Sequence, residues 1–228
     1  MITLYDLAVR DDRRPSPYCW RIKYALRHKG LPWREEPVGF TEKQKIAFAQ
    51  SQTVPVIQDG DKAVKDSWMI ARHLDQAYPD RPLFKDEDAL NLGRFVAGWV
   101  DTAVQPALFP IIIGDLHGWV HPDDRAYFEE SRGKRLGTTD FAGFQAKARE
   151  KGIAAFRSVL EPARRMLRDQ PYLCGAQAGY ADYALIGAFL WARSVSPLAL
   201  LTEDDPVHAW RERMLDLHDG LGRNVTAA

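Results

Sequence analysis

The sequence predicts an α/β domain over residues 1–80, a linker at 81–88 and an all-helical domain over residues 89–228. Short strand-like and helix-like patterns alternate in the first part, as they do in α/β folds. After the linker, RPLFKDED, the strand patterns fade and long amphipathic stretches follow. A length of 228 residues suits one large domain or two small ones.

Each element of the first part has a local signal. Residues 2–9, ITLYDLAV, predict a buried strand. Ser16 is a typical helix N-cap, Pro17 suits the first helical position, and Gly30 predicts that the helix ends at about Lys29. The other expected elements are a strand at 33–38, a short helix at 41–51, two strands around the Asp59-Gly60 turn, and a helix from about Trp68 to Tyr78 that ends before Pro79.

Five amphipathic stretches predict the helices of the second part. They cover about 88–118, 122–136, 148–169, 180–194 and 206–219. Pro106 and Pro110 lie inside the first stretch. Because proline has no backbone N–H and its ring clashes with the preceding turn, we expect a break or a kink there.

Composition and charge narrow the class of protein. Lys+Arg and Asp+Glu each number 31, so the net charge is zero and favours neither nucleic acid nor an anionic membrane surface. The longest apolar runs, such as 184–192, are about half a membrane span. The chain opens without a basic and apolar leader, and its two cysteines and six histidines show no disulfide or metal-ligand spacing. We expect a cytoplasmic protein without a bound metal or a membrane span.

The stretch PSPYCWRIKYALRHKG, residues 15–30, looks like a dithiol redox site in which Ser16 replaces the first thiol. Ser16 could be an ordinary N-cap, or its hydroxyl could stabilise the thiolate of a ligand. A thiol needs roughly 2 kcal/mol to be half ionised at pH 7. One hydroxyl at a helix N-terminus can supply that amount. Cys19 shares an apolar helical stripe with Ile22 and Leu26, which favours a packed cysteine over a redox thiol.

Two further motifs extend this hypothetical ligand site. Val54-Pro55 fits an edge strand, or a cis-proline turn that leaves the Val54 N–H and C=O free to pair with an extended peptide. Asp66-Ser67 fits a helix cap whose N-terminus and Ser67 hydroxyl bind a carboxylate while Asp66 binds an ammonium group. A thiol, a peptide unit and an α-amino acid end together describe glutathione.

These motifs resemble those of the glutathione transferase family. The segments SPYCWRIKYALRHKG, VPVI and DSWMIA, together with YPDRPLF and LTEDDP, are similar to bacterial lignin β-etherases, and serine-type fungal transferases share the Ser-Pro helix start. The resemblance spans nearly the whole chain and is most specific in the first half. It implies a thioredoxin-like first domain, an all-helical second domain and a homodimer.

The resemblance also implies roles for single residues. Ser16 would hold the glutathione thiolate, Val54 before Pro55 would pair with the cysteinyl backbone, and Asp66 and Ser67 would bind the γ-glutamyl end. Either Lys43 or Gln44 could meet the glycyl carboxylate, although a solvated helix face explains both equally well. Within AQAGYADYAL, Gly179 stands where the family prefers Ser, Thr or Asn as a cap, and Asp182 is interpreted as structural.

A hydrophobic site for a second substrate is expected between Ser16 and the long helix that begins near residue 88. Interdomain core would explain any one candidate, but an aromatic wall for an aromatic substrate explains the group. The candidates are Tyr18, Trp20, Trp99, Ala103, Phe109 and Ile113.

Three functions are consistent with these patterns. The first is a transferase that attacks an aromatic electrophile with the glutathione thiolate, by cleaving β-aryl ethers or by general conjugation or dehalogenation. The second is a glutaredoxin-like thiol transferase that uses Cys19. The third is a protein that binds glutathione or aromatic compounds without catalysis.

Overall fold

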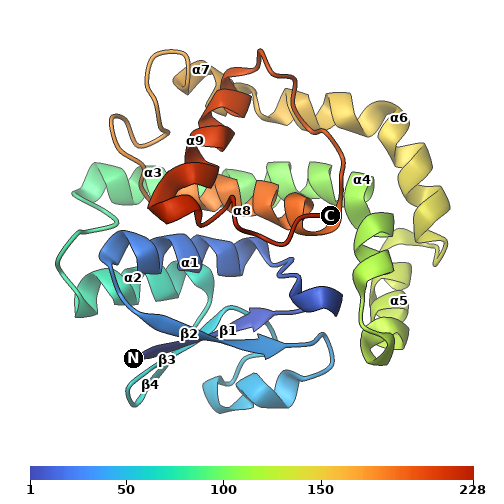
Figure 1. The fold of residues 1–228 in the computed structure, drawn as a ribbon, viewed down its shortest axis with the longest axis horizontal. Helices are drawn as coiled ribbons and strands as arrows, with labels where there is room; N and C mark the ends of the chain where they lie inside the picture. The colour runs from blue at the N-terminus through green and yellow to red at the C-terminus, as the bar shows by residue number, and fades with distance from the viewer.

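A computed structural model describes residues 1–228, and its first part is built around a mixed four-stranded sheet (Figure 1). The sheet order is β2-β1-β3-β4, with β1 and β2 parallel and the other neighbouring pairs antiparallel. The strands are β1 (Ile2–Leu7), β2 (Trp33–Val38), β3 (Val56–Asp59) and β4 (Lys62–Lys65). Helices α1 (Pro17–Lys29) and α2 (Ser67–Ala77) lie on the side of the sheet that faces the helical part of the chain.

Helix α1 has the bounds that its local signals predict. Ser16 caps its N-terminus by accepting a hydrogen bond from the Cys19 N–H at 3.2 Å, and Gly30 ends it in the left-handed conformation with φ of 67°. The predicted first strand ends earlier than expected, at Leu7, because residues 10–12 form a short 3-10 helix, η1 (Arg10–Asp12). The helix expected at 41–51 is also of the 3-10 type, η2 (Lys43–Ala49).

The second part is entirely helical, and its central element is nearly fully buried. Helix α8 packs against α1, α3 and α4, so it joins the two parts of the chain. The elements are α3 (Glu87–Trp99), a π-helical segment η3 (Val100–Val104), α4 (Gln105–Trp119), α5 (Pro122–Leu136), α6 (Phe141–Val159), α7 (Glu161–Met166), α8 (Tyr180–Val195) and α9 (Pro206–Gly220).

The prediction of one helix over 148–169 is wrong. The helix begins earlier, at Phe141, because the Asp140 carboxylate caps it by accepting a hydrogen bond from the Gly143 N–H at 2.9 Å. It then breaks at Leu160 before the short helix α7. Pro162 explains the break, since it provides no N–H to continue the helical hydrogen-bond ladder and fits the first turn of a new helix.

The run from α3 through η3 to α4 is a continuous helix that changes direction within α4 (Figure 1). The π-helical segment lies directly before Pro106, and Pro110 lies inside α4. Helices commonly absorb a proline through such local departures from α-helical geometry. The run Glu87–Trp119 is long and apolar enough to cross a bilayer, but more than half of its most apolar stretch is buried in the protein core.

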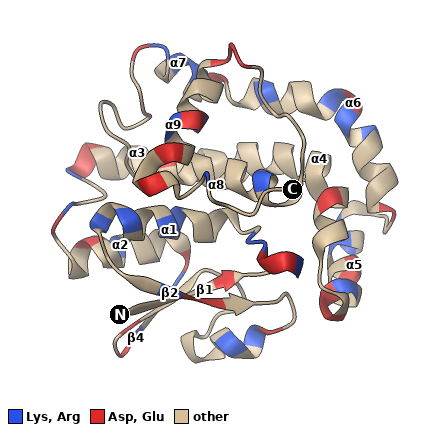
Figure 2. Ribbon diagram, in the orientation of Figure 1, with Lys and Arg blue, Asp and Glu red and all other residues tan.

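Specific contacts fix α1 against the helical part. The Tyr24 hydroxyl donates to the Met214 carbonyl at 2.8 Å, and His28 Nδ1 lies 2.7 Å from the Tyr183 hydroxyl. The rings of Tyr24 and Tyr183 are both buried in a hydrophobic core that the two parts of the chain share. Charged residues of both signs are spread over the two parts (Figure 2).

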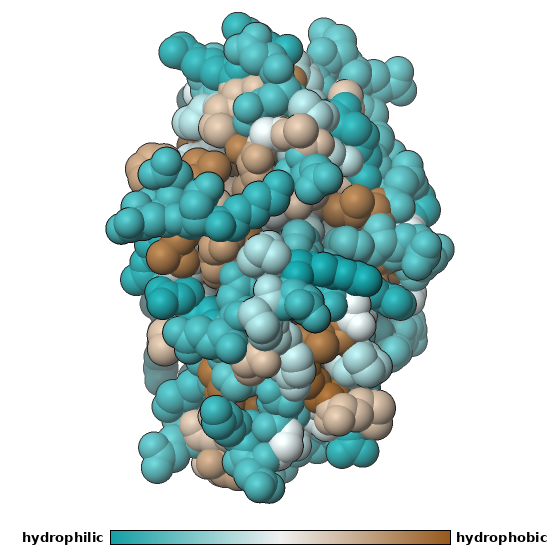
Figure 3. Space-filling view, turned by 90° about the vertical axis from the view of Figure 1, so that its left-hand side faces the viewer, coloured by the Kyte–Doolittle hydropathy of each residue, from teal (hydrophilic) through white to brown (hydrophobic).

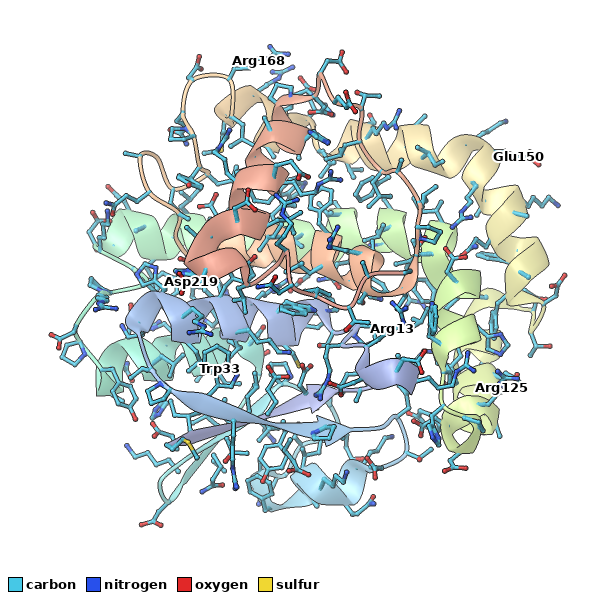
Figure 4. The ribbon with its side chains drawn as sticks, viewed as in Figure 1. Arg13, Trp33, Arg125, Glu150, Arg168 and Asp219 are labelled. Atoms are coloured by element: carbon cyan, nitrogen blue, oxygen red, sulfur yellow. The ribbon has the colours of Figure 1, made fainter.

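Arg13 ties the segment before α1 to the C-terminal segment of the chain (Figure 4). Its guanidinium donates to the carbonyls of Ser194, at 2.8 Å, and Thr226, at 3.3 Å. The same guanidinium lies 3.7 Å above the ring of Trp119 at the end of α4. These contacts position the loop that leads into Ser16.

The close approach of α8 to the start of α1 requires Gly187. A Cβ at this position would lie 2.3 Å from the backbone carbonyl oxygen of Pro17, which cannot move without shifting α1. We therefore expect Gly187→Ala to lower the free energy of unfolding by about 1–3 kcal/mol, as overpacking typically does. Urea denaturation measures the change. Gly118→Ala is the matched control, because a Cβ at Gly118 meets nothing within 4 Å, and equal effects of both variants would contradict the prediction.

Candidate functional site

A cavity of about 510 Å³ lies where β1 and β2 end and α1 begins. Helices α4 and α5 stand beside this end of the sheet and contribute the opposite wall (Figure 1). Ligands of open α/β sheets bind outside the carboxyl ends of the strands. The wall from the first part consists of Leu7, Pro15, Ser16, Pro17, Tyr18, Val38, Gly39, Phe40, Lys43, Ile46, Gln52, Thr53 and Val54, and the helical wall consists of Gln105, Phe109, Leu116, Tyr127, Ser131, Arg132, Arg135 and Trp191.

Ser16 places a hydroxyl and a helix N-terminus at the cavity. Its Oγ accepts the Cys19 N–H, and the side chain has no acceptor for its own hydroxyl proton within the chain. A hydroxyl can accept and donate at once, so this proton is free to bind an anion. The positive end of the α1 dipole favours negative charge at the same place.

Val54 offers an unpaired peptide group to the cavity. The Val54–Pro55 peptide bond is cis. Neither the Val54 N–H nor its C=O has a hydrogen-bond partner within the chain, and Val54 lines the cavity while Pro55 is buried behind it. The Ser51 hydroxyl supports this turn by donating to the Thr53 carbonyl at 2.7 Å. An extended peptide could add here as a further strand.

Asp66 and Ser67 lie at the start of α2 and are not part of the cavity wall. Asp66 has a positive φ of 71° with ψ of 130°, a strained conformation for a residue with a side chain. Its Oδ1 accepts the N–H groups of Trp68 and Met69 at 3.0 and 3.1 Å. The Asp66 Oδ2 atom has no partner within the chain, so it can take part in binding a charged group.

Two predicted members of the hydrophobic site, Tyr18 and Phe109, line the cavity. Burial and the nearby Asp101 carboxylate raise the pKa of Tyr18, so its phenol stays protonated and can donate a hydrogen bond. The Phe109 ring stacks on Trp191 with their centroids 6.1 Å apart. These rings form an apolar surface beside Ser16.

The other four predicted members, Trp20, Trp99, Ala103 and Ile113, do not line the cavity. Trp20 is buried, and its Nε1 donates to the Arg14 carbonyl at 2.7 Å. Ile113 is fully buried in the core. Trp99 and Ala103 are four residues apart, a spacing that would place them on one face of a regular α-helix. The π-helical segment η3 holds more residues per turn, so positions before and after it no longer share a face.

Several cavity residues on α5 and α8 are not among the site residues predicted from the sequence. Tyr127, Ser131 and Arg135 are spaced four residues apart on α5 and therefore share one helical face. That spacing was visible in the sequence, but a solvated helix face shows the same pattern. The Asp124 carboxylate holds α5 in place by accepting the N–H groups of Phe40 and Thr41 at 2.9 and 2.8 Å.

The structure separates the two candidates for the glycyl carboxylate. Lys43 lines the cavity, and its Nζ lies 4.7 Å from the centre of the Tyr127 ring. Gln44 is exposed to solvent and does not line the cavity. Lys43 is therefore the better placed of the two to meet an anionic group in the cavity.

Cys19 has the properties of a packed cysteine. Its side chain is fully buried, with Sγ 3.9 Å from the Tyr5 carbonyl oxygen. Burial, and then the Asp6 carboxylate, raise the pKa of the Cys19 thiol well above its usual range. A protonated and inaccessible thiol is a poor nucleophile. No group of three or more His, Cys, Asp or Glu side chains is arranged to hold a metal ion.

Asp182 is not part of the cavity wall, and it joins α8 to two other segments. Its carboxylate accepts the N–H groups of Leu173, Cys174 and Gly179 at 2.7, 3.2 and 3.1 Å, and the Trp210 indole N–H at 2.8 Å. Gly179 has no side chain, so only the Asp182 half of a capping box exists here. This geometry matches a structural role.

The fold is a thioredoxin-like domain followed by a helical domain, and both domains line the cavity. Two family models match the chain: the N-terminal domain of glutathione S-transferases over residues 15–77 and their C-terminal domain over residues 91–219. The chain therefore belongs to the glutathione S-transferase family.

Relatives from plants and fungi agree with this assignment. A rice protein, "Probable glutathione S-transferase GSTU6", is 24% identical over 212 residues, which covers 87% of this chain and 80% of the rice protein. The structure of CsGST63524 of Ceriporiopsis subvermispora, determined in complex with glutathione, has a TM-score of 0.84 and 24% identity, and the match covers 100% of this chain and 99% of that one. GSTFuA3 of Phanerochaete chrysosporium has a TM-score of 0.76 and 25% identity, with 96% and 92% covered.

Proposed function

We propose that this protein uses the thiolate of glutathione to attack an aromatic electrophile bound in the cavity. One observation carries the proposal: the free hydroxyl of Ser16 and the unpaired peptide group of Val54 meet in a cavity whose far wall carries aromatic side chains. Membership of the glutathione S-transferase family supports glutathione as the ligand.

In this proposal the glutathione backbone pairs with Val54, and its γ-glutamyl end reaches Asp66 and Ser67. The Ser16 hydroxyl donates to the sulfur, and the N-terminus of α1 adds a favourable dipole. Together they lower the pKa of the bound thiol, so that the thiolate is present near neutral pH. Lys43 meets the glycyl carboxylate at the cavity wall.

The likeness of the sequence to bacterial β-etherases makes β-aryl ether ketones the first substrates to test. The thiolate sulfur forms a bond to the carbon that carries the aryloxy group. The bond between that carbon and the ether oxygen breaks, and its electron pair leaves with the phenolate. The thiol proton is released to solvent. The phenolate takes up one proton from solvent and leaves as the phenol. The enzyme supplies the ionised thiol and its alignment.

Phenol release from a model β-aryl ether ketone, measured with and without glutathione, tests the specific reaction. Glutathione-dependent release above the buffer rate supports ether cleavage. If phenol release does not exceed that rate, ether cleavage is wrong, and a panel of aryl halides then tests general conjugation and dehalogenation. A protein that binds glutathione but turns over none of these compounds would be a carrier.

We expect Cys19→Ala to retain turnover within about twofold, because the Cys19 thiol is buried and protonated. Steady-state kinetics with an aromatic electrophile give the result. Glutathione-dependent reduction of a mixed disulfide should be no faster in the native protein than in this variant. A large loss of either activity in Cys19→Ala would instead support the hypothesis of a glutaredoxin-like thiol transferase that uses Cys19.

We also propose a cytoplasmic homodimer, as is typical of the family. The side of the molecule near α2 and α3 is mostly hydrophilic but carries separate apolar patches (Figure 3). Met69 on α2 and Phe95 on α3 have exposed fractions of 56% and 72%. Light scattering should give twice the monomer mass, and a monomeric mass would contradict the proposal.

A further inference from the structure

The cavity is lined by three cations and by no carboxylate. Lys43, Arg132 and Arg135 are the charged members of its wall. The whole chain has equal numbers of basic and acidic residues, so this excess of positive charge is local. Arg132 and Arg135 come from α5, on the helical side of the cavity.

Three acidic residues close to these cations in the sequence are occupied elsewhere. Asp124, on the first turn of α5, is 3% exposed and binds the loop at Phe40 and Thr41. Glu42 pairs with Lys45 at 2.8 Å, and Glu130 pairs with Lys134. None of them forms an ion pair with a cation of the cavity.

The two arginines lie over aromatic rings instead of pairing with carboxylates. The Arg135 guanidinium carbon is 4.8 Å from the centre of the Phe109 ring, which itself stacks on Trp191. The Arg132 guanidinium carbon is 5.2 Å from the Phe40 ring centre, and its Nη1 donates to the Ser131 hydroxyl at 2.9 Å. Guanidinium groups present several parallel donors that match planar anions.

We propose that the second substrate is an aromatic electrophile that carries an anionic group, such as a carboxylate or a sulfonate. Its ring packs on Phe109 and Trp191, and its anionic group pairs with Arg135 and Arg132. This inference rests on the proposed glutathione transferase function and names the substrate class for the same cavity.

Glutathione has carboxylates of its own, so the two sources of negative charge have to be separated. Lys43 lies on η2, beside the turn at Val54 in the cavity wall, and is the cation assigned to the glycyl carboxylate. Arg132 and Arg135 lie on α5 beside the aromatic wall. Filling the glutathione site with S-methylglutathione therefore leaves the two arginines free for a second anion.

A matched pair of fluorescent probes tests binding without any turnover. The anionic probe is 1-anilinonaphthalene-8-sulfonate, and N-phenyl-1-naphthylamine is the same aromatic system without the sulfonate. Both are titrated in the presence of saturating S-methylglutathione. In Arg132→Gln/Arg135→Gln we expect the affinity ratio of the anionic to the neutral probe to fall about tenfold to a hundredfold, the effect of losing two charge-assisted contacts.

Two further variants make the binding result specific. Lys134→Gln removes one positive charge beside Arg135, from a side chain outside the cavity that pairs with Glu130, so the ratio should stay unchanged. Arg132→Lys/Arg135→Lys keeps both charges and should recover most of the ratio, which also shows that the site still folds. A ratio unchanged by the double glutamine variant would overturn the inference.

Kinetics test the same preference in the reaction. The substrates are 4-chloro-3-nitrobenzoate and the corresponding benzamide, and each kcat/KM is divided by the uncatalysed rate constant. The thiolate forms a carbon–sulfur bond, chloride leaves with the carbon–chlorine electron pair, and the thiol proton goes to solvent. The double glutamine variant should lose the preference for the benzoate while the KM for glutathione stays within about twofold.

The outcomes separate this inference from the proposed function. If the variant raises the KM for glutathione and leaves the benzoate preference unchanged, the arginines serve glutathione and the inference is wrong. If neither substrate is turned over and S-methylglutathione does not bind, the proposed function fails, and the probe titration still decides whether the cavity selects anionic aromatics.

Discussion

Replacing Ser16 with alanine should lower the kcat/KM of glutathione conjugation by about tenfold to a hundredfold, which is the effect of removing one hydrogen bond to a charged group. The Ser16 hydroxyl is the cavity's free donor at the N-terminus of α1. Without it the bound thiol should titrate at higher pH. The thiolate absorbance of the glutathione complex, followed against pH, measures that change directly. Glutathione affinity should fall much less, because the other contacts remain.

Ser16→Ala also removes the cap of α1, so a loss of stability must be separated from a loss of chemistry. Asp86→Ala is the matched control, since the Asp86 carboxylate caps α3 by accepting the Ala89 N–H at 2.8 Å outside the cavity. Both variants should lose about 1 kcal/mol of unfolding free energy. Only Ser16→Ala should lose rate. Equal rates in both variants would show that Ser16 is a cap and nothing more.

The largest loss of stability is expected at Asp182. Asp182→Ala should lower the free energy of unfolding by about 3–5 kcal/mol, because it leaves three buried donors and one part-buried donor without an acceptor. These donors are the N–H groups of Leu173, Cys174 and Gly179 and the indole N–H of Trp210. Trp210 is fully buried, so water cannot easily replace the lost contact. Chemical denaturation followed by tryptophan fluorescence measures the change.

Two comparisons show whether the network or capping alone is responsible. Trp210→Phe removes one of the four donors and should cost less than Asp182→Ala. Asp140→Ala removes the cap of α6, whose single hydrogen bond joins the Asp140 carboxylate to the Gly143 N–H in an exposed position. It should cost only about 1 kcal/mol. If Asp182→Ala costs no more than Asp140→Ala, the interpretation of Asp182 as the centre of a buried network is wrong.

Features that depend on neighbours along the chain could be predicted from the sequence. The bounds of α1 follow from Ser16, Pro17 and Gly30, because capping and the left-handed conformation are local properties of the backbone. The start of α2 at Asp66 and Ser67 has the same kind of signal. Apolar periodicity similarly predicted that the second part is helical, since it requires no knowledge of what each face contacts.

Features that depend on partners distant in the chain could not be predicted in this way. Trp20 and Ile113 have the right chemistry for a hydrophobic site, but packing buries both, with the Trp20 Nε1 bonded to the Arg14 carbonyl. The face of α5 that carries Arg132 and Arg135 looks like a solvated helix until the Asp124 contacts bring it against the loop at residues 40–41. Local patterns therefore specify helices, caps and the position of Ser16. The composition of the cavity wall depends on how α4, α5 and α8 pack, because residues far apart in sequence share it only after the two parts of the chain have docked.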